Sequence, residues 1–266
     1  MNSELRQPAI TAAKLRKSYG EKIVLDGIDL SVAEGTAFAL LGPNGAGKST
    51  TVQILSTLLD ADAGEAQVGG HDLARDPNLV RGVIGVTGQF SAVDSLLTGQ
   101  ENLILMADLR HLGKPEGRRR VTELLEQFDL VDAARKPLAT YSGGMRRRLD
   151  LAMTLVGDPR IIFLDEPTTG LDPRSRHTMW QIIRDLVADG VTIFLTTQNL
   201  EEADLLADRI AVPDQGTPVA EGTPDEPTAP VPGGHIRLQV VDTNGLESAA
   251  SAPSASANTS GALRPP

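Results

Sequence analysis

A glycine-rich octapeptide directly after the apolar run 37–41 has the residue types and spacing of a phosphate-binding loop. Glycines let successive backbone N–H groups converge on phosphate oxygens, and the N-terminus of a following helix adds partial positive charge. Lys48 is suited to hold the β and γ phosphates, and Ser49 to place its hydroxyl on Mg²⁺. The pattern predicts a nucleoside triphosphate site, and the alternative is a glycine-rich turn that binds nothing. The predicted nucleotide-binding residues are Gly42, Pro43, Asn44, Gly45, Ala46, Gly47, Lys48, Ser49 and Thr50.

Two carboxylates, Asp165 and Glu166, follow a second apolar run at 161–164. Ligands of open α/β sheets bind at the carboxyl ends of the strands, which is where this pair would lie. Asp165 could reach Mg²⁺ directly or through water, while Glu166 could polarise a water for attack on the γ-phosphate. The alternative is an acidic pair at a helix N-terminus, where the helix dipole favours negative charge. Together with the phosphate loop, the pair favours the first interpretation.

Strand-like and helix-like segments alternate around these motifs. The apolar runs 161–164 and 191–195 have strand length, and the stretch 174–188 between them has the pattern of a helix. This βαβ order predicts a parallel sheet buried on both faces. Gln198 follows the second run, so it is expected at the same edge of the sheet as Glu166.

The remaining helical segments fall into two groups. A helix is predicted over 50–59, with Leu58 on its buried face, because apolar residues recur there with helical spacing. Two more helices are predicted over 101–112 and 117–128. They form part of a separate helical subdomain that spans about 90–157.

Composition narrows the classes of function. The 266 residues are 40% apolar, enough for a substantial core, but only 3% aromatic, and the net charge is −10. A nucleic-acid binder needs clustered Lys and Arg, so no nucleic-acid partner is expected. The arginine runs 118–120 and 146–148 are local exceptions, and each is predicted to be a solvated helix face or a subunit contact.

The chain contains no cysteine, which excludes disulfides and thiolate catalysis. Its four histidines are widely separated, so no transition-metal site is expected. The N-terminus lacks the pattern of a secretory signal, and no run of about 18 apolar residues occurs. The chain is therefore expected to be soluble by itself.

The C-terminal part changes composition. Pro213 and Pro218 fall in what should be a terminal strand pair, where each proline removes a ladder hydrogen bond. Residues 223–247 are predicted to be a proline-rich linker with a degraded accessory strand, and 248–266 a disordered tail. The folded domain is expected to span 9–222.

Residues 141–145, Tyr-Ser-Gly-Gly-Met, are similar to the Leu-Ser-Gly-Gly-Gln signature of ATP-binding cassette (ABC) proteins. The chain resembles that family from about 9 to 222, with every motif in the expected order. The resemblance implies an α/β fold, with a P-loop NTPase core, an antiparallel β subdomain and a helical subdomain carrying the signature. It also implies a homodimer in which the signature completes the partner's ATP site, through Ser142, Gly143, Gly144 and Met145.

The same resemblance assigns roles to isolated residues. Tyr19 is implied to stack on adenine, and Gln89 to contact ATP and Mg²⁺. Asp172 lies in the implied dimer loop, and Asp165 and Ser49 are implied Mg²⁺ ligands. Gln198 stands where most family members have a histidine that contacts the γ-phosphate, so it is implied to be catalytic together with Glu166.

Three runs, 85–89, 141–152 and 196–204, resemble the daunorubicin-resistance ATP-binding group of drug exporters. This implies an ATPase subunit, peripheral to the cytoplasmic face of the membrane, that drives efflux through a separate membrane permease. One alternative is a soluble cassette protein acting on ribosomes or DNA, which usually carries two cassettes or a coiled-coil insertion. The other is a nucleotide-binding regulator without turnover, which Glu166 disfavours.

Overall fold

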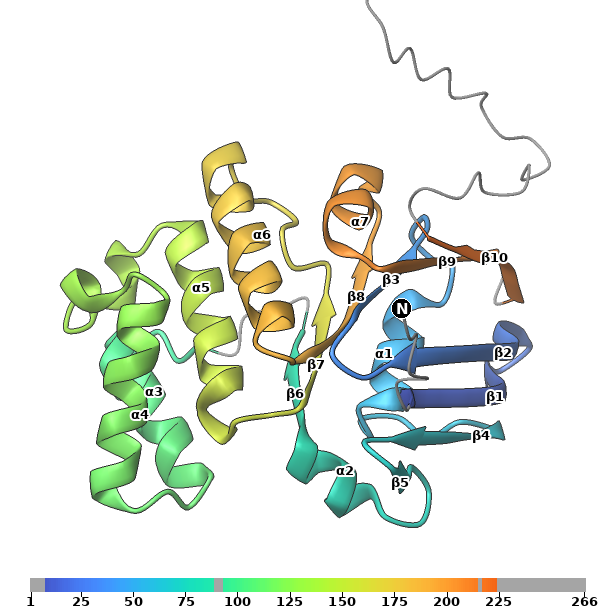
Figure 1. Cartoon of the computed structure of the whole chain (residues 1–266), viewed down its shortest axis with the longest axis horizontal. Coiled ribbons are helices and arrows are strands. Elements are labelled where there is room, and N and C mark those ends of the chain that lie inside the picture. The colour runs from blue at the N-terminus through green and yellow to red at the C-terminus, as the bar shows by residue number, and fades with distance from the viewer. Residues whose placement is uncertain (1–7, 89–92, 215–216, 224–266) are drawn as a thin grey trace, which may run out of the picture. The chain divides into compact units, whose positions relative to one another are not determined.

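Six strands form the sheet at the centre of the fold, in the order β10-β9-β3-β8-β7-β6 (Figure 1). The strands from β6 to β9 are parallel, and only β10 runs antiparallel to its neighbour. The parallel arrangement follows from the βαβ order of the chain, as the sequence predicts. The strand bounds are β3 (Ala37–Leu41), β6 (Ile84–Thr87), β7 (Ile161–Asp165), β8 (Thr192–Thr197), β9 (Arg209–Asp214) and β10 (Thr217–Gly222).

This computed structural model describes residues 8–88, 93–214 and 217–223. All of them belong to one unit, Met1–Ala229. The predicted accessory strand, the disordered tail and nearly all of the linker lie outside the described residues. Among the helices described, none is long and apolar enough to cross a membrane.

Helices connect the parallel strands. They are α1 (Lys48–Leu55) after β3, α6 (Pro173–Ala188) between β7 and β8, and α7 (Leu200–Leu206) between β8 and β9. Side chains of the strands alternate between two cores. In β3, Ala37 and Ala39 belong to the core that includes residues of α6 and α7, whereas Phe38 and Leu40 belong to the core that includes residues of α1. The sheet is therefore buried on both faces, which confirms that prediction.

A second sheet is antiparallel, in the order β2-β1-β4-β5. Its strands are β1 (Pro8–Tyr19), β2 (Lys22–Ala33), β4 (Ala63–Val68) and β5 (His71–Asp72), followed by α2 (Pro77–Val83). Apolar residues of β1 and β2 share a core with α1, which carries the end of the phosphate loop. This sheet is the antiparallel β subdomain that the ABC resemblance implies.

A helical part contains α3 (Gly99–Leu109), α4 (Lys114–Gln127) and α5 (Gly143–Thr154), drawn in green in Figure 1. Short 3₁₀ turns cover Val131–Ala133, Leu138–Thr140 and Leu155–Gly157. Thr98 and Glu101 form a capping box that fixes the start of α3. Residues from all three helices join the core beneath α6. The bounds of the helical subdomain, about 90–157, and of the whole domain, 9–222, remain predictions.

Two local predictions differ from the structure. The helix predicted over 50–59 ends at Leu55, because Thr57 takes a left-handed backbone with φ of 63°, and Leu58 is 69% exposed. The terminal strands β9 and β10 do pair despite their prolines, and Pro213 and Pro218 lie opposite each other in the register. Because β3 pairs only with residues 209–211 of β9, the missing N–H of Pro213 removes no bond to β3.

Candidate nucleotide site

The phosphate loop runs from the end of β3 into α1 and wraps around the side chain of Lys48. The Lys48 amine is buried and donates hydrogen bonds to the carbonyls of Gly42 (2.7 Å) and Pro43 (3.0 Å). Gly47 has φ of 92°, and a Cβ there would lie 2.6 Å from the side chain of Leu25. Only glycine fits this turn, which brings the loop backbone against β2.

A cavity of about 140 Å³ opens beside the loop. Residues from the start of β2 and from the loop line it: Lys22, Val24, Asn44, Gly45, Gly47, Lys48, Ser49 and Thr50. Lys22, which the sequence analysis missed, adds a second positive charge to the wall. The turn at 19–21 was the available signal, because it brings the start of the next strand back toward the loop.

Two of the three residues proposed to contact a metal, Ser49 and Asp165, lie against each other. Ser49, in the first turn of α1, donates a 3.2 Å hydrogen bond to Asp165 Oδ1 at the end of β7. The Thr196 hydroxyl of β8 donates to the same oxygen, and Asp165 is buried. A hydroxyl and a carboxylate oxygen are suitable Mg²⁺ ligands, and a site that uses few protein ligands is typical of that ion. The donor set therefore fits Mg²⁺.

Glu166 is held in an unusual backbone conformation. Its φ is 48°, in the left-handed region that non-glycine residues adopt at a cost of about 1–3 kcal/mol. Its backbone N–H donates to both the carbonyl and the hydroxyl of Thr196, each at 3.1 Å. Its carboxylate accepts a 3.0 Å bond from the Thr169 hydroxyl and lies 3.9 Å from the Lys48 amine. The strained backbone aims the carboxylate at the phosphate loop.

Gln198 links that carboxylate to the loop. Its side-chain amide donates to Glu166 Oε1 at 2.7 Å and to Asn44 Oδ1 at 2.9 Å. These contacts bring together residues that follow β3, β7 and β8, at the carboxyl edge of the sheet.

Electrostatics in this cluster are dominated by Lys48. Burial lowers the pKa of the Lys48 amine, and the nearby carboxylates of Glu166 and Asp165 oppose that shift without cancelling it. A polyphosphate at the loop would add negative charge next to the amine and favour its protonated form. The cluster is thus suited to bind a phosphate group.

The signature segment begins α5. Ser142 is the N-cap of this helix, and its hydroxyl accepts a 3.2 Å bond from the backbone N–H of Met145. Gly144 lies so close to α6 that a Cβ there would come within 2.3 Å of the Ser175 hydroxyl. Tyr141 is a core residue, buried and donating a 2.7 Å bond to the carbonyl of Ala133. Ser142 and Gly143 stay exposed at the helix N-terminus.

Asp172 and Tyr19 are the other predicted site residues that the structure describes. Asp172 is the N-cap of α6, where the Ser175 hydroxyl and backbone N–H donate to it and hold its pKa below the ordinary value. Tyr19 ends β1 and is 50% exposed, with the Lys17 amine 5.9 Å from its ring centroid. Gln89 lies outside the described residues.

Residues 146–148 are predicted to be a solvated helix face or a subunit contact, and the solvated face is wrong for Arg147 and for Arg148, which is 16% exposed. The Arg147 side chain is only 12% exposed, whereas Arg119 of the other run is 61% exposed and pairs with acidic residues of its own helix. Arg147 instead donates hydrogen bonds to backbone carbonyls at the ends of β6 and β7, those of Gly88, Asp165 and Pro167. A run of arginines looks the same in sequence whether its members face water or carbonyls.

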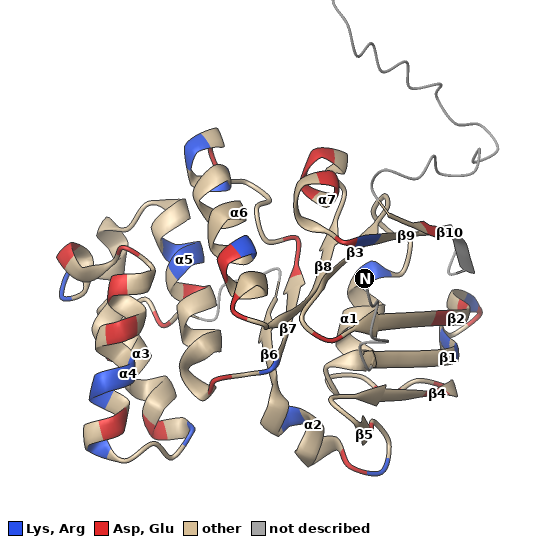
Figure 2. Ribbon diagram, in the orientation of Figure 1, with Lys and Arg blue, Asp and Glu red and all other residues tan. Residues whose placement is uncertain are grey.

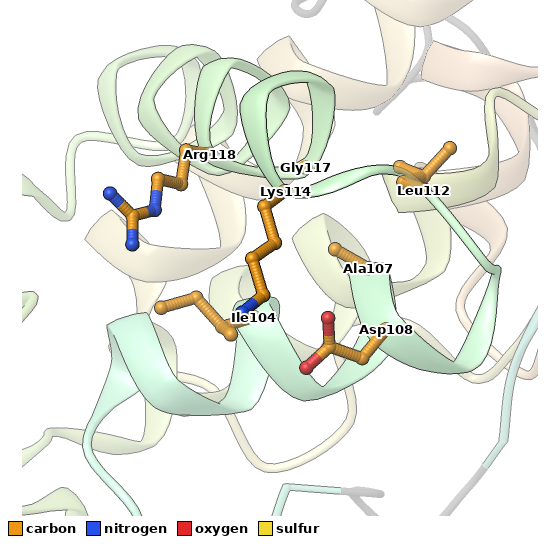
Figure 3. Close-up of a pocket in the computed structure, with 7 residues that line it drawn as sticks. All are labelled: Ile104, Ala107, Asp108, Leu112, Lys114, Gly117 and Arg118. Carbon is orange, nitrogen blue, oxygen red and sulfur yellow. The ribbon is translucent and has the colours of Figure 1, made fainter.

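A second hollow of about 140 Å³ lies between α3 and α4 (Figure 3). Its walls are the apolar parts of both helices, and charged side chains stand at its rim. The lining residues are Ile104, Ala107, Asp108, Leu112, Lys114, Gly117 and Arg118. None of them is a predicted nucleotide-site residue.

Comparisons with known proteins agree with the motifs. A family model described as "ABC transporter" matches residues 25–169. The chain is 56% identical to the daunorubicin resistance ATP-binding protein DrrA2 of Streptomyces coeruleorubidus, over 88% of this chain and 73% of that protein. It is 51% identical to the daunorubicin/doxorubicin resistance ATP-binding protein DrrA of Streptomyces peucetius, over 88% and 71%. The solved structure of cbiO1 from Clostridium perfringens, part of the ABC transporter complex cbiONQ, aligns with a TM-score of 0.74 and 26% identity, over 82% of this chain and 89% of that one.

Proposed function

The chain belongs to the ABC transporter family, and on that premise we propose that it is the ATP-hydrolysing subunit of an exporter. Its substrate is a drug or hydrophobic natural product, which leaves through a separate membrane permease. The observation that carries the proposal is the position of the Glu166 carboxylate. It lies between Lys48, Thr169 and Gln198, next to the contact between Ser49 and Asp165.

ATP binding follows from the loop geometry. The backbone N–H groups at the start of α1 point toward the phosphates, where the helix dipole also favours negative charge. The Lys48 amine neutralises the β and γ phosphates. Ser49 and Asp165 would hold Mg²⁺, which when bound would supply charge neutralisation for the phosphoryl group.

Glu166 and Gln198 prepare the attacking water. The Glu166 carboxylate accepts a hydrogen bond from the water and polarises it for in-line attack on the γ-phosphate. The Gln198 amide donates a 2.7 Å hydrogen bond to that carboxylate. Its second bond, to Asn44 Oδ1, fixes the position of the amide relative to the phosphate loop. Gln198 is a positioning residue, because an amide does not take up or release a proton near neutral pH.

Two copies of the chain form the working unit. The exposed N-terminus of α5, with Ser142 and Gly143, supplies backbone N–H groups and a positive dipole end to the γ-phosphate in the partner's site. Gly144 and Met145 complete this segment, and Asp172 belongs to the loop at the dimer interface. Tyr19 would pack on the adenine. Gln89 lies outside the described residues, and its proposed contact with the nucleotide and Mg²⁺ rests on the family resemblance alone.

The proposed partner of the ATPase is a membrane permease, through which ATP hydrolysis would drive export. Support comes from the names of the relatives, which are drug-resistance ATP-binding proteins, and from cbiO1, which is part of a transporter complex. The subunit accordingly works at the cytoplasmic face of the membrane as a peripheral protein. No nucleic-acid partner is proposed, in keeping with the net charge of −10.

Drug accumulation in the native host tests the export proposal. A strain carrying only Lys48→Ala should retain more of at least one hydrophobic drug from a panel than the wild-type strain. Lys114→Ala, a change of the same kind on α4, is the matched control and should leave accumulation unchanged. Equal accumulation of every drug in the two strains, with normal ATPase activity of the purified wild-type chain, would contradict drug export but not ATP hydrolysis.

A further inference from the structure

We propose that Arg147 is a positioning residue that couples the two ATP sites of the dimer. It joins α5, whose N-terminus serves the partner's site, to the catalytic edge of the sheet in its own chain. The inference rests on the proposed dimeric ATPase and adds a residue to its mechanism. The basic stretch that contains Arg147 is drawn in blue on α5 in Figure 2.

The Arg147 guanidinium uses all three of its nitrogens. Nη1 donates to the Gly88 carbonyl at 2.8 Å, Nε to the Pro167 carbonyl at 3.0 Å, and Nη2 to the Asp165 carbonyl at 3.1 Å. A planar guanidinium presents several donors in a fixed fork, so one side chain can hold three separate backbone segments in a set geometry.

The three carbonyls lie next to proposed catalytic residues in the chain. Asp165 and Pro167 flank Glu166, so Arg147 holds the backbone on both sides of the residue with φ of 48°. Gly88 follows the neighbouring strand β6 and directly precedes Gln89. One side chain therefore holds the ends of two adjacent parallel strands, β6 and β7, at the carboxyl edge of the sheet.

The nitrogen that donates to the Gly88 carbonyl, Nη1, also ties the guanidinium to its own helix. Asp150, one turn further along α5 and buried, forms a 3.2 Å ion pair with Arg147 Nη1. Arg147 itself is 12% exposed, so water competes little for these bonds. The guanidinium thus moves with α5 as a rigid attachment.

Ser142 lies at the N-cap of the same helix. One helix therefore carries both the segment proposed to contact the partner's ATP and the arginine that holds the backbone around Glu166. When its N-terminus engages the phosphate in the partner's site, any shift of α5 pulls on the carbonyls of Asp165 and Pro167 in its own site. The alignment of Glu166 then depends on occupancy of the other site. Such a link gives positive cooperativity between the two sites.

Arg148 provides a matched control from the same run of arginines. It donates to the Phe128 carbonyl at 3.0 Å and pairs with Asp129 at 3.1 Å, both within the helical part. Its side chain is 16% exposed, close to the value for Arg147. Replacing either arginine with lysine keeps the charge and removes the fork, but only the change at 147 breaks contacts with β6 and β7.

The experiment compares full-length wild type, Arg147→Lys and Arg148→Lys. Turnover against ATP concentration gives kcat and the Hill coefficient, and titration with a fluorescent ATP analogue gives nucleotide affinity. For Arg147→Lys we expect kcat to fall about tenfold to a hundredfold, the size of loss that a small misplacement of catalytic groups causes. Its Hill coefficient should fall toward one, while nucleotide affinity stays unchanged. Arg148→Lys should match wild type.

Hydrogen–deuterium exchange without nucleotide provides a second measurement. The peptide covering 165–171 should exchange faster in Arg147→Lys than in wild type, and unchanged in Arg148→Lys. If Arg147→Lys does not fold, Arg147→Gln takes its place, and failure of both to fold while Arg148→Lys folds would mean a structural role and overturn the proposal.

Other outcomes separate the two claims. Unchanged kcat and Hill coefficient in Arg147→Lys would overturn the coupling role, as would a loss of nucleotide affinity that accounts for the whole loss of turnover. A wild-type chain without ATPase activity would contradict the proposed function instead, because the coupling proposal presupposes turnover.

Discussion

Gln198 donates a 2.7 Å hydrogen bond to the carboxylate of Glu166, although the two residues are 32 positions apart in the chain. The same amide donates to Asn44 of the phosphate loop at 2.9 Å. The residue that stands at the usual histidine position of the family therefore bridges the proposed catalytic carboxylate and the loop. This arrangement fixes distances without adding a titrating group.

Replacing Gln198 tests that bridge. Gln198→Ala should lower turnover by about tenfold to a hundredfold, because Glu166 loses its orientation but keeps its charge. Gln198→His should retain activity and acquire a new pH dependence near pH 6.5, roughly where an unperturbed histidine titrates. Steady-state ATPase rates between about pH 6 and 8 measure both effects.

The control for this pair is Gln181→Ala, on the exposed face of α6, which should leave the rate unchanged. Wild-type turnover in Gln198→Ala across the whole pH range would show that Gln198 is only a structural residue at the end of β8.

Glu166→Gln should bind ATP but not hydrolyse it. The amide is nearly the same size as the carboxylate, but it cannot polarise water in the same way. Because ATP then remains bound, the dimer should persist, and size-exclusion chromatography with Mg-ATP should detect it. Glu116→Gln, on the exposed surface of α4, is the matched control. Hydrolysis by Glu166→Gln at the wild-type rate would remove Glu166 from its proposed role.

Ser49→Ala should raise the Mg²⁺ concentration needed for half-maximal activity. The change removes the hydroxyl that contacts Asp165 at 3.2 Å, and with it one of the three proposed metal ligands. Titration of ATPase activity with Mg²⁺ at fixed ATP measures the shift, and Ser31→Ala on the exposed face of β2 serves as control. An identical Mg²⁺ titration for Ser49→Ala would rule out the proposed ligand.

Tyr141→Phe should destabilise the fold by about 1 kcal/mol, the net worth of a typical buried hydrogen bond. The variant loses the 2.7 Å bond to the Ala133 carbonyl, which keeps a second donor in the backbone N–H of Lys136. Urea unfolding measures the difference. Tyr19→Phe, at the half-exposed tyrosine, should have no comparable effect, and equal stability of Tyr141→Phe and wild type would disprove a contribution from that hydroxyl.

Much of this fold could be predicted from the sequence. The phosphate loop can be recognised in the sequence because its turn demands glycine: at Gly47, with φ of 92°, a Cβ would lie 2.6 Å from the side chain of Leu25. The strands 161–164 and 191–195 can be recognised because a strand buried on both faces is a nearly continuous apolar run, with Thr192 as the exception here. The Ser-Gly-Gly segment is similarly constrained, since a Cβ at Gly144 would come within 2.3 Å of the Ser175 hydroxyl.

What the sequence did not reveal depends on contacts between distant residues. Arg147 is buried because carbonyls of Gly88 and Pro167 happen to face it, and backbone carbonyls leave no trace in the sequence. The early end of α1 depends on the left-handed backbone of Thr57, which no glycine marks. The bridge from Gln198 to Glu166 likewise becomes visible only when strands β7 and β8 lie side by side.

The central claim is that two copies of this chain share composite ATP sites, each with Lys48 from one copy and Ser142 from the other. Lys48→Ala and Ser142→Arg should each be inactive alone, but their mixed dimer keeps one site with both residues intact. The decisive measurement is ATPase activity across mixing ratios of the two purified variants. The account predicts activity that neither variant has alone, highest near equal amounts. If no mixture exceeds the separate variants while wild type is active, the composite sites are contradicted.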